Sequence, residues 1–301
     1  MLDLLQVTFP VSGVQTGLFV PPLVAFVISY FTSMAGISGA FLLLPFQISV
    51  LGFSTPSVTS TNFLFNLIGP PGGIYRYARE GRLAWPLAGV LAGGLLPGIL
   101  AGYYLRVLYL PDPQRFKLFV AMVLMGIGLK LFWSIRAEVK DDEKMPGAAV
   151  GQVVRGAIGP GVTRFEFMGK THAFSTPAMA GAAFLVGVIG GAYGIGGGSI
   201  LAPLCITVFR LPVYVLAGAI LLGTVISSLA GLLFYSLIPV AGTVAPPDWP
   251  LGLLFGAGGL AGIYCGAKTQ RHVPERWIKA MLGIIVLIVA FRYLATFFRT
   301  L

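Results

Sequence analysis

The sequence predicts an all-α polytopic membrane protein made of two inverted repeats, each with a glycine-broken re-entrant or discontinuous hairpin and three transmembrane helices. Composition is the first observation behind this prediction. Of the 301 residues, 56% are hydrophobic and only 10% are charged, and the mean hydropathy is positive. A soluble domain of this size does not need so apolar a composition for its core, so the chain is expected to lie in a membrane.

Long charge-free stretches are the second observation. Residues 4–75, 171–209 and 211–247 contain no Asp, Glu, Lys or Arg. Continuous apolar runs are typical of membrane-spanning helices, whereas the strands of a membrane barrel alternate between polar and apolar residues. The spans are therefore expected to be helical.

A duplicated glycine motif is the third observation. GIGGGSILAP, residues 194–203, has four glycines in five residues, and GISGAFLLLP, residues 36–45, aligns with it without a gap at an offset of 158 residues. Two longer segments, which start at Pro86 and Pro250, also align. Their matched glycines are Gly94 with Gly258, Gly98 with Gly262, and Gly102 with Gly266. The chain is therefore predicted to be a duplication in which a glycine break opens each half.

The first half contains the shortest arms. Residues 18–30 and 41–51 flank the glycine break, and each arm is shorter than the ~20 residues of a helical span. These arms predict a re-entrant hairpin or a discontinuous helix. A stretch rich in Ser, Thr and Asn follows at 52–66, before a Pro-Pro-Gly-Gly sequence. Two ordinary spans complete the half, at 85–105 and 116–133.

The second half repeats this plan after a hydrophilic segment. Its arms and spans are expected at 178–193, 200–209, 211–237, 249–267 and 276–295. The segment between the halves carries charges of both signs and then an alternating pattern. So short a segment can form a small insert with strands, as a regulatory cap or a plain connector, but hardly an independent domain. The predicted organisation is a first repeat at 1–135, an insert at 136–177 and a second repeat at 178–301.

Charge counting decides how the halves are related. The net charge is +10, and no basic soluble module is evident that would bind nucleic acid. If each break forms a hairpin, the halves are inverted and one membrane face gathers 15 of the 20 Lys and Arg residues. If each break lies within one continuous span, the halves are parallel and the split weakens to 12 against eight. The excess of cations in cytoplasmic loops favours the inverted arrangement, with the insert in the cytoplasm.

The apolar spans offer little catalytic chemistry. No Asp, Glu or His lies deep in them, the sequence has no P-loop or zinc motif, and Cys205 and Cys265 have no CxxC or His neighbour. These patterns favour buried thiols over a disulfide or a metal site. We expect no enzyme activity, no metal and no cofactor.

The glycine breaks are the expected binding site. A helix that restarts after a break presents unpaired N–H groups and the positive end of its dipole, and two such ends bind an anion without a buried Lys or Arg. Inverted repeats with broken helices hold their substrate near the midplane of the membrane. The residues predicted to bind it are Gly36, Ser38, Gly39, Ala40, Gly194, Gly196, Gly197, Gly198 and Ser199. The alternative is that these glycines only permit close helix packing.

Polar side chains supply a second wall. Asn62 and Asn66 lie one turn apart on one helix face, and Asn is costly in lipid unless it faces a partner or a cavity. We expect both to line the site, together with Thr224 from the equivalent part of the second half. Nearby hydroxyl groups have the alternative of bonding back to their own helix. They belong to Thr59, Ser60, Thr61, Ser227 and Ser228.

At its two glycine motifs the sequence resembles the TauE/SafE family of membrane permeases, which carry G-x-G-G-[GS]-x-[IL]-x-x-P near the start of each half. Residues 194–203 match fully, whereas residues 36–45 have Ser38 and Ala40 in glycine positions. The resemblance implies export or uptake of small sulfur-containing anions such as sulfite, thiosulfate or organosulfonates, across a prokaryotic inner membrane. Which anion, which direction and which oligomeric state are left open.

Three classes of function follow from these observations. The first is a secondary transporter, probable exporter by resemblance, for a small inorganic or organosulfur anion. The second is an anion channel in which the same backbone donors line a continuous pore. The third is a membrane enzyme or assembly factor, which the lack of a convergent acid, base, nucleophile or metal set disfavours.

Overall fold

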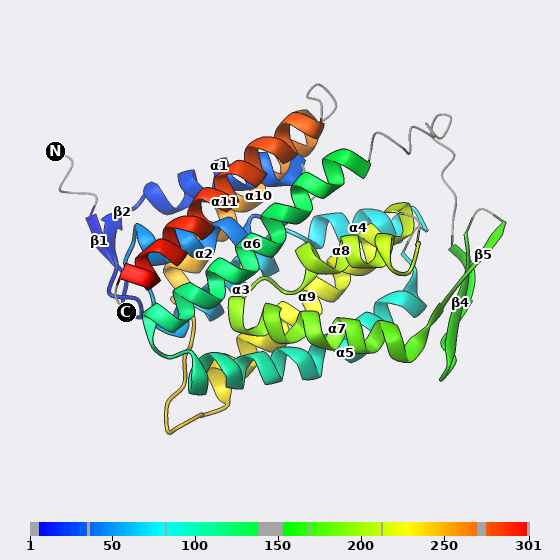
Figure 1. Cartoon of the computed structure of the whole chain (residues 1–301), viewed down its shortest axis with the longest axis horizontal. Coiled ribbons are helices and arrows are strands. Elements are labelled where there is room, and N and C mark those ends of the chain that lie inside the picture. Colours follow the sequence, from blue (N-terminus) through cyan, green and yellow to red (C-terminus); the bar gives the residue numbers. More distant parts are fainter. Residues whose placement is uncertain are drawn as a thin grey trace.

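The computed structural model describes residues 6–34, 37–81, 83–137, 153–167, 169–211, 213–269 and 275–299. Within these ranges the chain is mostly helical, and six helices are long and apolar enough to cross a membrane (Figure 1). They are α5 (Trp85–Tyr104), which continues into the π-helical turn η2 (Leu105–Tyr109), α6 (Pro113–Ala137), α7 (Thr176–Tyr193), α9 (Val213–Leu237), α10 (Trp249–Thr269) and α11 (Glu275–Arg299). The chain is thus a polytopic helical membrane protein.

Shorter helices complete the bundle. They are α1 (Val20–Met34), α2 (Ala40–Ser49), α3 (Ser57–Ile68), α4 (Pro71–Arg79) and α8 (Gly198–Thr207). The polar stretch of the first half forms α3, and Gly69 and Pro70 separate α3 from α4 because proline removes a backbone donor from the ladder. The corresponding α9 of the second half runs without a break.

Two helix crossings repeat the same glycine contact. A Cβ added at any of three glycines of α5 would overlap a carbonyl oxygen of α7. The glycines and the residues that carry these oxygens are Gly94 with Ala180, Gly98 with Phe184 and Gly102 with Val188. On α10, an added Cβ would overlap a carbonyl oxygen of α1 at three positions, which pair Gly258 with Pro22, Gly262 with Phe26 and Gly266 with Tyr30. The carbonyl set of α1 precedes that of α7 by 158 residues, the offset of the glycine motifs. Each half therefore packs its first helix on the other half through the small residues that let backbones approach.

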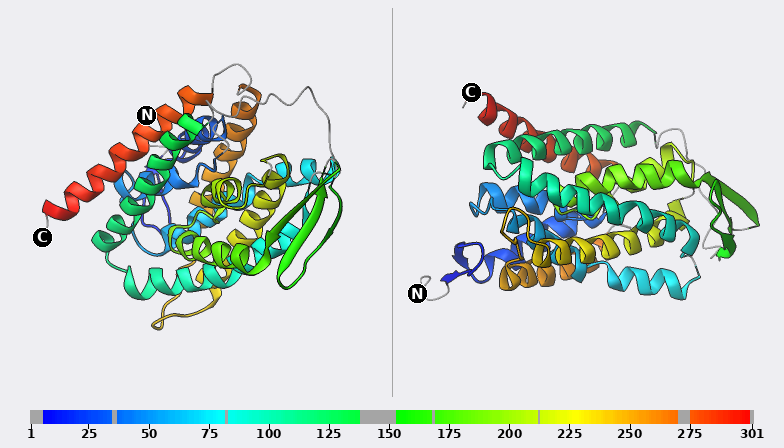
Figure 2. Two further views of the ribbon diagram at one scale, coloured as in Figure 1. Left: turned by 45° about the vertical axis from the view of Figure 1, so that its right-hand side comes forward. Right: turned by 90° about the horizontal axis from the view of Figure 1, so that it is seen from below.

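A small antiparallel sheet precedes the first helix of each half. The strands β1 (Gln6–Thr8) and β2 (Gln15–Gly17) lead into α1, and β3 (Val153–Ala157), β4 (Val162–Phe167) and β5 (Lys170–Ser175) lead into α7. The two sheets lie at opposite ends of the molecule in both figures (Figures 1 and 2). Strands were expected in the segment between the halves, but the hairpin β1–β2 was not.

The sheet before α7 packs against the start of α5, and the sheet before α1 packs against the start of α10. A Cβ added at Gly156 of β3 would lie 2.5 Å from Pro86 Cγ at the start of α5. At the other end, the buried carboxylate of Asp248 accepts hydrogen bonds from Ser12 N–H (2.9 Å) and Ser12 Oγ–H (2.8 Å). Its second oxygen accepts a bond from Leu251 N–H (3.4 Å) and so caps α10.

Candidate functional site

The second glycine break is built from left-handed residues. Helix α7 ends at Gly194, where φ is 87°, and the chain passes through Gly196 (62°) and Gly197 (80°) before α8 begins. Only glycine adopts such angles without steric cost, so this part of the motif specifies the backbone path. All three residues are buried.

This path leaves backbone donors without partners. The N–H groups of Ile200 and Leu201 both bond to the carbonyl of Gly197. Among the described residues, the N–H groups of Gly196, Gly197 and Gly198 find no acceptor. They lie at the start of α8, where the helix dipole adds a partial positive charge.

The first break has a different local structure. Gly39 precedes α2 with a right-handed φ of −64°, and no described residue from 37 to 40 has a positive φ. The hydroxyl of Ser38 donates to Asn66 Oδ1 (2.8 Å) and accepts the N–H of Ala40 (3.3 Å). A side chain therefore satisfies one donor here, the N–H of Ala40, whose counterpart at Gly198 has no acceptor among the described residues. Gly36, also predicted as a binding residue, lies outside the described residues.

The two breaks contact each other through Asn62 and Asn66, which are fully buried on α3. The amide of Asn62 donates both to Ala40 O (3.0 Å) and to Gly194 O (3.2 Å), and the amide of Asn66 also donates to Gly194 O (3.1 Å). The hydroxyl of Tyr193 adds a bond to Phe41 O (2.7 Å). The amide N–H groups of both asparagines are thus already bonded to backbone carbonyls.

Helix α9 lies against the second break. The hydroxyl of Ser227 donates to Gly196 O (2.8 Å), whereas that of Thr224 donates to Ile220 O (2.9 Å) on its own helix. The Thr224 side chain still contacts the break, because its Oγ1 fills the space that a Cβ at Gly198 would need. The predicted residues of the second half therefore do lie together; the side chain of Ser199 is outside the described part.

Gln47 is a buried polar residue that the sequence analysis did not name. Its amide donates to Asn62 Oδ1 (3.4 Å), and its own Oε1 has no partner among the described residues. The signal was present in the sequence, since Gln in an apolar run is costly in lipid for the same reason as Asn.

Arg106 is a buried cation at the end of a span. Its guanidinium donates to Ser54 O (2.8 Å) and to Leu110 O, and its Cζ lies 3.6 Å from the centre of the Phe116 ring. The expected site needs no buried cation, but Arg106 places one directly after the span expected at 85–105. Its contacts are with Leu110 after the η2 turn, with the loop before α3 and with Phe116 on α6.

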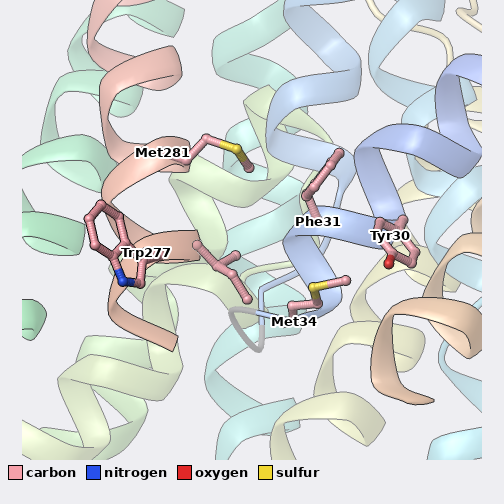
Figure 3. Close-up of a pocket in the computed structure, with 6 residues that line it drawn as sticks. Tyr30, Phe31, Met34, Trp277 and Met281 are labelled. Carbon is pink, nitrogen blue, oxygen red and sulfur yellow. The ribbon is translucent and has the colours of Figure 1, made fainter. Parts of the chain in front are cut away.

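A separate cavity lies between α1 and α11. It has a volume of about 190 Å³, and Figure 3 shows the side chains that line it. They belong to Tyr30, Phe31, Met34, Trp277, Ile278 and Met281. This lining is aromatic and apolar and includes no residue of the glycine breaks, so it suits contact with lipid better than an anion.

The fold and the site together define a multi-pass membrane protein whose two helix breaks meet inside the helical bundle, an arrangement typical of membrane permeases. The family model for the sulfite exporter TauE/SafE matches residues 22–293, and the chain belongs to this family.

One curated relative supports the same class. The probable membrane transporter protein YunE of Bacillus subtilis (strain 168) is 24% identical over 195 residues. The match covers 64% of this chain and 64% of that relative, so it spans just under two thirds of the relative's length. No solved structure matches the chain.

Proposed function

We propose that the protein is a secondary transporter, and by family an exporter, of a small sulfur-containing oxyanion such as sulfite, thiosulfate or an organosulfonate. The family match supports the class of substrate. The observation that carries the site is the set of N–H groups at Gly196, Gly197 and Gly198, which find no acceptor in the described ranges of the chain. Donors of this kind at a helix start bind anions.

The asparagines have a supporting role in this proposal. A carbonyl oxygen near an anion repels it, and here the carbonyls of Ala40 and Gly194 are each covered by an amide N–H. The local field around the breaks is therefore dominated by donors. The second break contributes one donor more than the first, because Ser38 already occupies the N–H of Ala40 there.

The proposal includes inverted repeats in a prokaryotic inner membrane. The two sheets precede α1 and α7 from opposite ends of the molecule, which supports opposite directions for the two halves (Figure 2). The exchanged glycine crossings, whose carbonyl partners are offset by 158 residues, support a two-fold relation. The bias of 15 of 20 cations to one face supports a cytoplasmic position for β3–β5.

The test is transport by the purified full chain in proteoliposomes. Sulfite, thiosulfate, sulfoacetate, sulfate and chloride are offered separately, and uptake is measured with and without the same anion on the opposite side. Saturable uptake of a sulfur oxyanion that is stimulated from the opposite side supports a carrier. Current that follows voltage, without such stimulation, identifies a channel. Uptake of none of these anions contradicts the proposal.

A further inference from the structure

We propose that two buried serine hydroxyls, Ser29 and Ser228, complete the anion site, and that the site selects a singly charged oxyanion over a doubly charged one of the same shape. This inference rests on the proposed function and names the charge of its substrate. Two independent features carry it: an unpartnered hydroxyl beside each break, and the absence of charge on the helices around them.

Ser228 lies beside the second break. It is fully buried on α9, and its Oγ has no partner among the described residues. A Cβ added at Gly196 would lie 2.7 Å from this oxygen, so the hydroxyl lies directly against the backbone of the break. The neighbouring Ser227, in contrast, bonds to Gly196 O.

Ser29 lies beside the first break, on the helix that leads into it. It is fully buried on α1, and its Oγ is likewise without a partner in the described part of the chain. A Cβ added at Gly39 would lie 3.0 Å from it. Each break therefore has one hydroxyl directed at it from a neighbouring helix.

Such hydroxyls are costly in a folded protein. A buried donor without a partner loses its hydration and gains nothing in return, whereas other hydroxyls nearby are bonded. Those bonded groups belong to Ser38, Thr59, Ser60, Thr61 and Ser227. An anion between the breaks would supply acceptors for both orphan hydroxyls at once.

The charge of that anion follows from the helices around it. The stretches that contain α1, α2 and α3, α7 and α8, and α9 carry no charged residue. The start of a helix is equivalent to roughly half a positive charge, so the starts of α2 and α8 together offset about one negative charge. A second negative charge would stay uncompensated where water is excluded.

The buried cations of the described residues lie outside the helices that follow the breaks. Arg106, in η2, contacts Ser54 O, Leu110 O and the Phe116 ring. Lys279 lies on α11, which packs mainly on α6 and α1; α11 reaches α2 through Tyr293, which donates to Pro45 O about four helical turns from Lys279.

Competition for sulfite uptake tests the charge selectivity. Methanesulfonate and sulfate are matched tetrahedral probes that differ by one charge, and each is added to proteoliposomes during uptake of labelled sulfite. We expect methanesulfonate to inhibit at a concentration at least about tenfold lower than sulfate. Equal inhibition, stronger inhibition by sulfate, or no inhibition by methanesulfonate overturns the inference while the transporter stands. If sulfite is not taken up, the competition is run on the sulfur oxyanion that is; uptake of none of them refutes the proposed function instead.

Serine substitutions test the two hydroxyls. Ser29→Ala and Ser228→Ala should each raise the half-saturating concentration of sulfite about tenfold, since a hydrogen bond to a charged group is lost. Both variants should keep or raise the melting temperature, because an unsatisfied group is removed. The matched control is Ser236→Ala, which removes another unpartnered hydroxyl two turns further along α9 and should leave transport unchanged. Wild-type transport by Ser29→Ala and Ser228→Ala, or equal losses in Ser236→Ala, contradicts the assignment.

Discussion

The first and second glycine breaks occupy the same place in their halves, yet different groups shape them. At the second break, three left-handed glycines turn the chain and leave N–H groups unpaired. At the first, the hydroxyl of Ser38 ties the turn to Asn66 and to Ala40, and Gly39 is right-handed. The two copies of the motif thus lie at equivalent positions, but left-handed glycines shape the second and a side-chain hydrogen bond shapes the first.

This difference implies a division of roles between the breaks. Both breaks are bonded to α3, but the N–H of Ala40 in the first is occupied by Ser38, whereas its counterpart at Gly198 finds no acceptor among the described residues. Substitutions at equivalent positions should therefore have unequal effects, and the following predictions run from the largest expected effect to the smallest.

Gly197→Ala should be the most damaging change. Its φ of 80° costs an L residue about 1–2 kcal/mol, and the new Cβ would lie 2.9 Å from Leu95 Cδ2. We expect loss of sulfite uptake and a lower melting temperature in detergent. The matched change Gly39→Ala keeps a right-handed residue and should cost much less. Similar losses in the two variants would show that the breaks are equivalent.

Asn62→Leu should rank second, because the Asn62 amide donates hydrogen bonds to both breaks. The substitution removes bonds to Ala40 O and Gly194 O and leaves the first of these carbonyls without its amide partner. We expect the free energy of unfolding to fall by about 1–3 kcal/mol, with weaker anion binding. Asn66→Leu is the comparison variant and should cost less: Ser38 Oγ loses its acceptor, but Gly194 O keeps its bond from Asn62 and Ala40 O keeps its amide partner. A larger effect at Asn66 would contradict this order.

Ser38→Gly should have a smaller effect and would sharpen the comparison directly. It restores a family glycine and removes the bonds to Asn66 Oδ1 and Ala40 N–H, at a cost of about 1 kcal/mol. The freed N–H of Ala40 should preserve or improve the apparent affinity for sulfite in uptake assays. A complete loss of uptake would mean that the Ser38 hydroxyl itself contacts the substrate.

Tyr193→Phe should have the smallest effect of the four. It removes the single bond to Phe41 O and keeps the ring in the core. The expected loss is about 0.5–1.5 kcal/mol of stability, seen as a modest fall in melting temperature, with normal uptake. Abolished uptake in a folded variant would assign Tyr193 to the transport path.

Much of the helical bundle could be predicted, because long apolar runs in the sequence identify membrane-spanning helices directly. The expected span at 211–237 is observed as Val213–Leu237, and that at 249–267 as Trp249–Thr269. The hairpin β1–β2 could not be predicted, since QVT and QTG are too short to show a period of two. Its anchor, Asp248, lies more than 230 residues away in the chain.

The helix breaks were predictable in their location and not in their bonding. Glycine clusters marked both breaks, but nothing local distinguishes the right-handed Gly39 from the left-handed Gly197. Likewise, the bond from Asn62 to Gly194 O joins residues 132 positions apart. Ser29 could not be singled out, because a hydroxyl on a helix usually bonds to its own backbone.

The glycine-lined crossings of α5 on α7 and of α10 on α1 also set how closely the two halves approach. At three positions of each crossing, hydrogen atoms of a glycine meet a peptide oxygen of the other helix, so no side chain fits between the backbones. Both crossings repeat this contact at every fourth residue. A methyl group at any of these six glycines would therefore push the halves apart on its own side of the breaks.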